Sequence, residues 1–192
     1  MELTSGFELT TSITNIFIFV VSLISFIKIK KNSMWKFFFF CMCICSFLGV
    51  IVHGIEMSQN TNNILWAILS LCFTITINTL LCIFMNLRYK HMIILSVLLS
   101  ILLCTQLLLD LNFILTFTLY VLLVLILCTY YILKSDNRKL YLIGFFITLI
   151  GGILMLSKCK ISILNHNGLC HVFMAVGLVF LYLGSKKEID YN

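Results

Sequence analysis

Three of the four histidines in this sequence stand beside long apolar runs, where ionisable side chains are costly and are usually paired or functional. His53 ends one such run. His166 and His171 open the stretch NHNGLCHVFMAVGLVFLYLG (165–184). Neutral imidazoles with a carboxylate and an open position suit a catalytic zinc ion, because the metal lowers the pKa of a bound water to about 7. These three histidines are therefore candidate zinc ligands.

Other polar residues could assist such a site. Ser46 and His53 are seven positions apart and share a helix face at about 100° per residue, and Glu56 lies about 60° round from His53. Ser46 is about 10 Å deeper than His53, so it could only meet a substrate or a water that enters the bundle. Asp110 is a second carboxylate near the same membrane face. We name Glu56 and Asp110 as candidate bases and Ser46 as a candidate assisting residue.

Each of these residues also has a simpler interpretation. Histidines at helix ends commonly anchor a helix at the membrane surface, with one ring nitrogen in water. Ser46 could bond its own backbone carbonyl one turn back. Glu56 and Asp110 could serve only to solubilise loops.

The composition indicates which elements must position these residues. Of 192 residues, 61% are apolar and 10% are charged, against about 45–50% and 25% in an ordinary soluble domain. A spanning helix needs about 20 mainly apolar residues, because in lipid every backbone polar group must be satisfied within the segment. The sequence predicts an all-α, multi-pass integral membrane protein, a single seven-helix domain over residues 1–192. Its predicted helices are 14–27, 34–53, 64–87, 92–109, 113–133, 140–156 and 168–184.

Two features of this pattern leave alternatives open. The first run is short unless residues 9–12 extend it, and the polar gap at 110–112 is the weakest boundary, so that runs four and five could form a re-entrant pair.

Most cysteines lie inside apolar runs, where a thiol behaves as a small hydrophobe. Cys159 and Cys170 lie near an aqueous edge and could pair.

The basic residues predict the orientation, since lysine and arginine in short loops are retained on the cytoplasmic side. The net charge is +6, and 11 of the 13 basic residues fall on one side of a seven-helix arrangement. We therefore expect the amino terminus outside, the carboxyl terminus in the cytoplasm, and the three histidines at the outer face. This excess suggests contact with anionic lipid head groups and does not argue for nucleic acid. The eleven residues are Lys28, Lys30, Lys31, Lys36, Arg88, Lys90, Lys134, Arg138, Lys139, Lys186 and Lys187.

These features together resemble the CREST superfamily of membrane hydrolases, which includes the alkaline ceramidases and the adiponectin-receptor relatives. The resemblance rests on a histidine at the outer end of the second helix, a histidine pair opening the seventh, and the topology. It implies a zinc ion held by His53, His166 and His171, with a lipid amide as substrate. The histidine pair is spaced HxxxxH where the family has HxxxH, so the two rings converge only if His166 precedes the helix. Gly49 occupies the position of the family's serine.

The leading hypothesis is a zinc-dependent membrane hydrolase, in which a bound water attacks an amide or ester carbonyl of a lipid reached laterally from the bilayer. Its rivals are a non-catalytic membrane scaffold or accessory protein, and a small transporter or receptor. The phenylalanines at 37–40, with Tyr141 and Tyr182, are predicted to be lipid-facing bulk and an aromatic belt. Asn78 is predicted to form interhelical hydrogen bonds.

Overall fold

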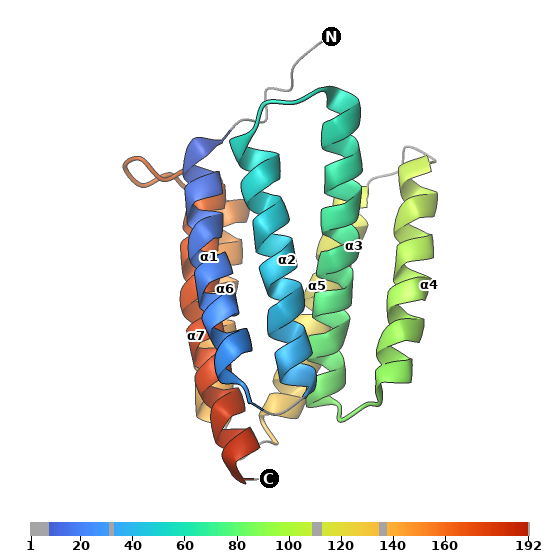
Figure 1. Cartoon of the computed structure of the whole chain (residues 1–192), viewed down its shortest axis with the longest axis vertical. Helices are drawn as coiled ribbons and strands as arrows, with labels where there is room; N and C mark the ends of the chain where they lie inside the picture. Colours follow the sequence, from blue (N-terminus) through green and yellow to red (C-terminus); the bar gives the residue numbers. More distant parts are fainter. Residues whose placement is uncertain (1–7, 31–32, 109–112, 135–137, 192) are drawn as a thin grey trace.

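The computed structural model describes residues 8–30, 33–108, 113–134 and 138–191. These residues form seven helices that run side by side along the long axis of the molecule (Figure 1). The prediction of an all-α chain is confirmed. The helices are α1 (Leu9–Lys28), α2 (Met34–Gly54), α3 (Gln59–Phe84), α4 (Tyr89–Leu108), α5 (Phe113–Ile132), α6 (Arg138–Leu156) and α7 (His166–Tyr191).

The observed helices follow the predicted apolar runs, with differences at their ends. α1 begins at Leu9, so residues 9–12 do extend the first run. α4 and α5 are separate helices of 20 residues each, about the length that crosses a hydrocarbon core. The predicted boundary at 110–112 lies outside the described residues.

Capping side chains explain why two helices begin earlier than hydropathy predicts. The Ser58 hydroxyl accepts a hydrogen bond from the Thr61 backbone N–H at 3.3 Å, which starts α3 at Gln59. Asn165 caps α7 in the same way, because its Oδ1 accepts from the Gly168 N–H at 2.7 Å. An N-cap satisfies a backbone donor that has no partner inside the helix. α7 therefore starts at His166 instead of 168.

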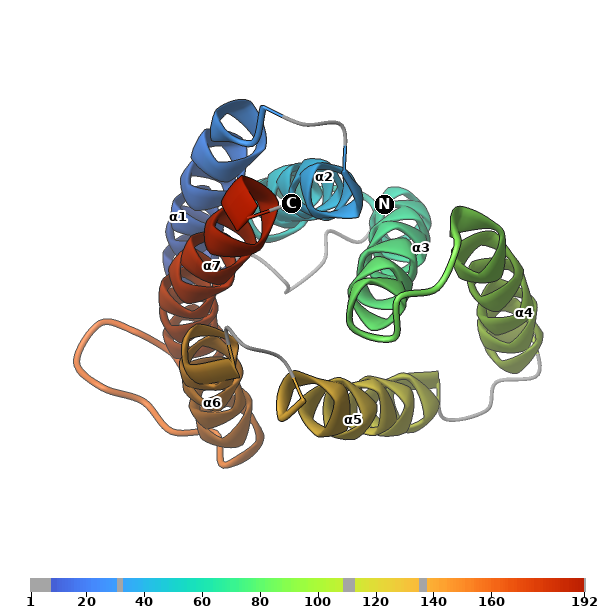
Figure 2. The ribbon, with the colours of Figure 1, turned by 90° about the horizontal axis from the view of Figure 1, so that it is seen from below.

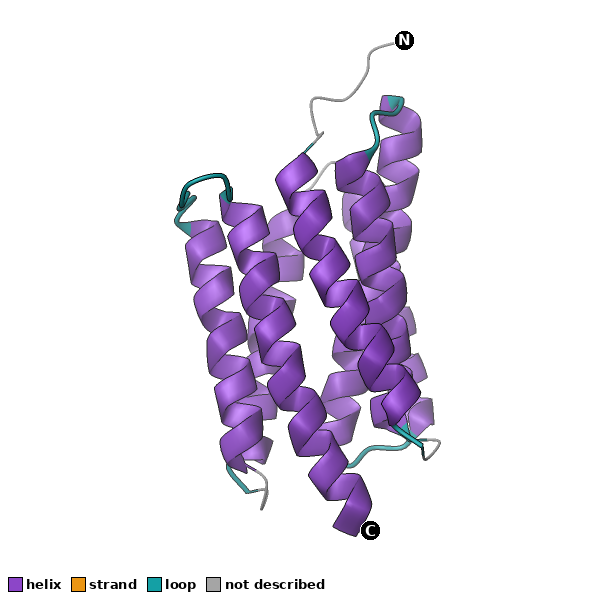
Figure 3. Ribbon diagram, turned by 60° about the vertical axis from the view of Figure 1, so that its left-hand side comes forward, coloured by secondary structure: helices purple, strands orange, loops and turns teal. Residues whose placement is uncertain are grey.

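Contacts between helices show which helices are neighbours in the bundle. α1 packs against both α2 and α7, and α7 packs closely on α6. α3 lies beside α2 on one side and contacts α4 and α5 on the other, as the end-on view shows (Figure 2). Loops join the helices at both ends of the bundle (Figure 3). α1 therefore lies between α2 and α7 and contacts both helices.

The interior contains aromatic side chains that hydropathy alone assigned to lipid. Phe38, Phe39 and Tyr141 are buried, and the indole of Trp35 stacks on the Tyr141 ring with centroids 5.5 Å apart and planes 9° from parallel. Only Phe40 of the four-phenylalanine run is largely exposed. The prediction of lipid-facing bulk was therefore wrong for Phe38, Phe39 and Tyr141, because one helix turn directs successive side chains to different sides.

Polar residues inside the bundle behave as predicted. The Asn78 amide donates to the Ser96 hydroxyl at 3.0 Å, and the Tyr120 hydroxyl donates to the Asn78 carbonyl oxygen, so α3 is bonded to both α4 and α5.

Cys159 and Cys170 are both free thiols. The described part of the chain does not pair them.

Within the residues that the structure describes, five helices are long and apolar enough to cross a membrane: α1, α2, α3, α6 and α7. Their exposed surfaces are largely leucine, isoleucine, valine and phenylalanine side chains, which suit contact with lipid acyl chains. Helical structure and apolar surface together indicate a membrane protein.

Candidate functional site

His53 and His171 meet at one end of the bundle. His53 is the next-to-last residue of α2 and His171 lies near the start of α7, and their ring centroids are 6.2 Å apart. The two helices run in opposite directions and both pack against α1, which brings these ends to the same level (Figure 1). Two of the predicted ligands, 118 positions apart in the sequence, thus lie side by side in the fold.

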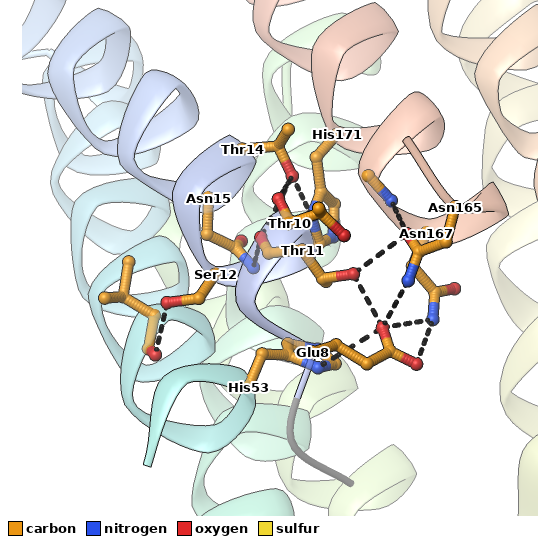
Figure 4. A network of polar contacts seen from close by, with 12 residues as sticks. Glu8, Thr10, Thr11, Ser12, Thr14, Asn15, His53, Asn165, Asn167 and His171 are labelled. Carbon is orange, nitrogen blue, oxygen red and sulfur yellow. Dashed lines mark hydrogen bonds and ion pairs between the residues drawn. The ribbon is translucent and has the colours of Figure 1, made fainter. Parts of the chain in front are cut away.

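Glu8 adds a carboxylate to the histidine pair. One of its oxygens accepts from the Thr11 hydroxyl at 2.6 Å and from the side-chain amides of Asn165 and Asn167, each at 3.0 Å (Figure 4). The same oxygen lies 3.9 Å from Nδ1 of His53, and the Glu8 backbone N–H donates to the His53 carbonyl at 2.9 Å. A single side chain therefore contacts α1, the end of α2 and the start of α7. We call Glu8, His53 and His171 the histidine–glutamate cluster.

The contacts of Glu8 favour its ionised form. Burial alone would raise the pKa of the Glu8 carboxyl. The hydrogen bonds from Asn167, Thr11 and Asn165, together with the neighbouring His53, outweigh burial and lower the pKa below its ordinary value. The cluster therefore holds a negative charge at neutral pH.

Thr14 positions the second histidine. Its hydroxyl lies 3.3 Å from Nδ1 of His171 and within hydrogen-bond reach of the Thr10 and Thr11 carbonyls, at 3.0 and 2.9 Å (Figure 4). A hydroxyl has one proton to donate, and when that proton goes to a carbonyl the oxygen accepts from a protonated Nδ1. Nε2 of a neutral His171 then keeps its lone pair. In that arrangement Nε2 is the ring nitrogen that can accept a proton.

Trp66 of α3 lies against the other histidine. The indole and the His53 imidazole are perpendicular, with centroids 5.5 Å apart. His53 therefore contacts aromatic rings from two helices, since it also faces His171.

The third predicted ligand, His166, is not brought into the cluster. α7 already includes His166 as its first residue, so the condition for convergence, that it precede the helix, is not met. At about 100° per residue, five positions separate the two α7 rings by about 140°. Among the described residues, no three histidine, cysteine, aspartate or glutamate side chains are placed to hold a metal ion together.

Of the predicted assisting residues, the structure describes Ser46 and Glu56. Ser46 is buried and donates to the backbone carbonyls of Met42 and Cys43, at 2.7 and 3.1 Å. Glu56 is exposed beyond the end of α2. Asp110 lies outside the described residues. The simpler interpretation of Ser46 accounts for its hydrogen bonds.

Gly49 has a specific packing role where the resemblance would place a serine. A Cβ atom at Gly49 would lie 2.8 Å from Oδ1 of Asn15 on α1. Nearby, the Ser12 hydroxyl donates to the Val50 carbonyl at 2.9 Å. The absence of a side chain at Gly49 lets α1 approach α2 closely, and this approach carries Glu8 to His53.

The sequence reasoning missed Glu8, although a signal for its helix was present. Polar residues recur along α1 at helical spacing, and they are buried: Thr11, Ser12, Thr14, Asn15, Ser22 and Ser25. Such a stripe indicates that α1 turns this face toward protein. Glu8 precedes the stripe by one turn and continues it.

Comparison with protein families gives one match. Residues 10–190 match the family of unknown function DUF6962. The chain belongs to this family. No curated protein and no solved structure matches the chain. The matched region of this DUF6962 member includes His53 and His171, and Glu8 lies just before it.

Proposed function

We propose that this DUF6962 member is a multi-pass membrane hydrolase that cleaves a lipid amide or ester at the histidine–glutamate cluster. The observation that carries the proposal is the meeting of His53 and His171, with ring centroids 6.2 Å apart, beside the Glu8 carboxylate, which accepts hydrogen bonds from three side chains. Ionisable groups in membrane helices are costly, and grouping them at one point marks a site by default.

The proposal includes seven membrane crossings, with the cluster at the outer face. The ends of α1, α3 and α5 and the starts of α2, α4 and α6 lie at the end of the bundle away from the cluster (Figure 1). Basic residues are concentrated in those connections, and lysine and arginine are retained on the cytoplasmic side. This charge distribution supports an outward-facing cluster.

The side chains of the cluster can supply acid–base chemistry. A neutral imidazole can take a proton from a water as the water oxygen attacks the carbonyl carbon of the substrate. The resulting imidazolium can then give that proton to the leaving amine or alcohol, so the proton count balances. Glu8 lies 3.9 Å from Nδ1 of His53, where its carboxylate can orient the imidazole ring. General acid–base catalysis of this kind contributes about 10²–10⁴-fold in rate.

Zinc stays a prediction of the resemblance. By helix geometry His166 and His171 are about 140° apart around α7, and no group of three histidine, cysteine, aspartate or glutamate side chains that could hold a metal ion is found among the described residues. His53 and His171 are the two residues that either mechanism requires.

Turnover by the reconstituted protein tests the proposal. The full chain in phosphatidylcholine vesicles is incubated with a panel of N-acyl lipid amides and lipid esters, and released fatty acid is measured by mass spectrometry. We expect release from at least one substrate, lost in His53→Ala and in His171→Ala and retained in His91→Ala, because His91 lies at the other end of the bundle, at the start of α4. No release by the wild type, or full activity in His53→Ala, contradicts the proposal.

A second candidate is a structural clasp in a non-catalytic membrane protein. Glu8 alone bonds side chains from α1 and from the start of α7 and a backbone carbonyl of α2. Those bonds would hold three helix ends together without any reaction. In that case Glu8→Gln and His53→Ala lower the thermal stability of the protein, and neither the wild type nor the variants release fatty acid.

A further inference from the structure

Trp66 packs against His53 and is itself exposed at the surface of the bundle. The His53 side chain is 13% exposed, and the Trp66 indole meets its ring edge to face at 5.5 Å. Trp66 itself is 41% exposed. Exposed apolar surface on a helix long enough to span a membrane faces acyl chains.

The depth of this contact suits the scissile linkage of a lipid. His53 is one residue from the end of α2, and Trp66 lies two turns inside α3, which starts at the same end of the bundle. Tryptophan favours the membrane interface because its ring is apolar and its N–H is polar. The ester or amide linkages of membrane lipids lie at this boundary between head groups and acyl chains.

We propose that Trp66 forms the wall between His53 and the bilayer, and that a lipid acyl chain enters between α2 and α3 by displacing the indole. Trp66 is then a specificity-determining residue. This inference rests on the proposed function, because it places the substrate carbonyl at the histidine pair. The indole at the entrance offers a large apolar surface to an acyl chain.

Photolabelling tests the route without requiring turnover. The full-length protein is reconstituted in phosphatidylcholine vesicles containing an N-acyl lipid amide with a diazirine on its acyl chain. After illumination, peptides are mapped by mass spectrometry. We expect labelling of the segment around His53 to increase several-fold in Trp66→Ala and to a smaller extent in Trp66→Phe.

Two controls separate an opened route from a general effect. Leu71→Ala removes a side chain of similar exposure, 45%, from another side of α3, and it should leave labelling at His53 unchanged. Trp35 is 3% exposed, so labelling around it reports unfolding. If neither Trp66 variant labels the His53 segment more than Leu71→Ala does, the proposed route is wrong.

The hydrolysis assay, run on the same samples, distinguishes the two proposals. Release of fatty acid that depends on His53, with labelling that does not respond to Trp66, overturns the route and leaves the proposed function. Labelling that responds to Trp66, with no release by the wild type, overturns the hydrolase and supports the lateral route as a lipid-binding site.

Discussion

The hydroxyl of Thr14 lies 3.3 Å from Nδ1 of His171, although the two residues are 157 positions apart in the sequence. Thr14 is on the first helix and His171 on the last, so the contact joins the two ends of the chain. Together with the bonds of Glu8, it makes α1 the helix that assembles the histidine–glutamate cluster.

Removing the Thr14 hydroxyl should loosen this contact. We expect Thr14→Val to lower the free energy of unfolding by about 0.6 kcal/mol, the average for an interhelical hydrogen bond in a membrane protein. Thr14→Ser keeps the hydroxyl and should behave like the wild type. Unfolding in mixed detergent micelles measures stability, and ¹⁵N NMR of labelled histidine reports whether Nδ1 of His171 stays protonated. Identical spectra for the valine and serine variants would show that Thr14 does not select the tautomer.

The lowered pKa of Glu8 predicts a pH-dependent contribution to stability. A carboxyl whose pKa is lower in the folded than in the unfolded protein stabilises the fold above its ordinary pKa of 4.5, and this contribution is lost as pH falls through the folded value. The stability difference between wild type and Glu8→Gln should therefore be largest near neutral pH and shrink on acidification. Thermal unfolding from pH 7 to pH 3 measures it.

The matched control for this experiment is Glu56→Gln. Glu56 lies near the same end of α2 and is exposed, whereas Glu8 accepts hydrogen bonds from three side chains. The Glu56→Gln variant should track the wild type at every pH. If Glu8→Gln and Glu56→Gln changed the thermal stability equally, the pH dependence would come from the overall charge of the protein and not from the contacts of Glu8.

The close contact of α6 with α7 depends on glycine. A Cβ at Gly177 would collide with the Thr148 hydroxyl and would lie 2.7 Å from the Gly144 carbonyl oxygen, whereas a Cβ at Gly152 would meet nothing within 4 Å. Gly177→Ala should lower the free energy of unfolding by about 1–3 kcal/mol, the usual cost of overpacking. Gly152→Ala should cost nothing by this mechanism. Unfolding of the two variants in detergent measures whether the close approach of the two backbones stabilises the packing of α6 on α7.

Metal content decides the zinc prediction. A zinc hydrolase requires about one zinc ion per chain in the purified protein, lost in a His53→Ala/His171→Ala variant. His166→Ala should also lose the ion if His166 is the third ligand, and Glu8→Gln should lose it if Glu8 takes that place. Inductively coupled plasma mass spectrometry of the four proteins measures this. Hydrolysis by zinc-free wild type would reject the metal and leave acid–base chemistry at the histidine pair.

The sequence by itself determined the helices and which residues could reach one another. Apolar runs separated by short polar segments predicted the seven helices. The largest differences are the earlier starts of α1 and α3 and the later end of α7, and the Ser58 and Asn165 caps account for the earlier starts of α3 and α7. The same pattern placed His53 and His171 at one end, because helices two and seven must run in opposite directions. Hydrogen bonding within a helix is local, so these features required no knowledge of packing.

Only the tertiary structure decided which helix faces meet. Hydropathy distinguishes an apolar environment from water, but lipid and protein interior are equally apolar, so it could not show that Phe39 and Tyr141 are buried. For the same reason it could not show that Glu8 reaches His53 while His166 lies apart. Those relationships depend on the rotation of each helix about its axis, and packing such as that of Asn15 against Gly49 sets this rotation.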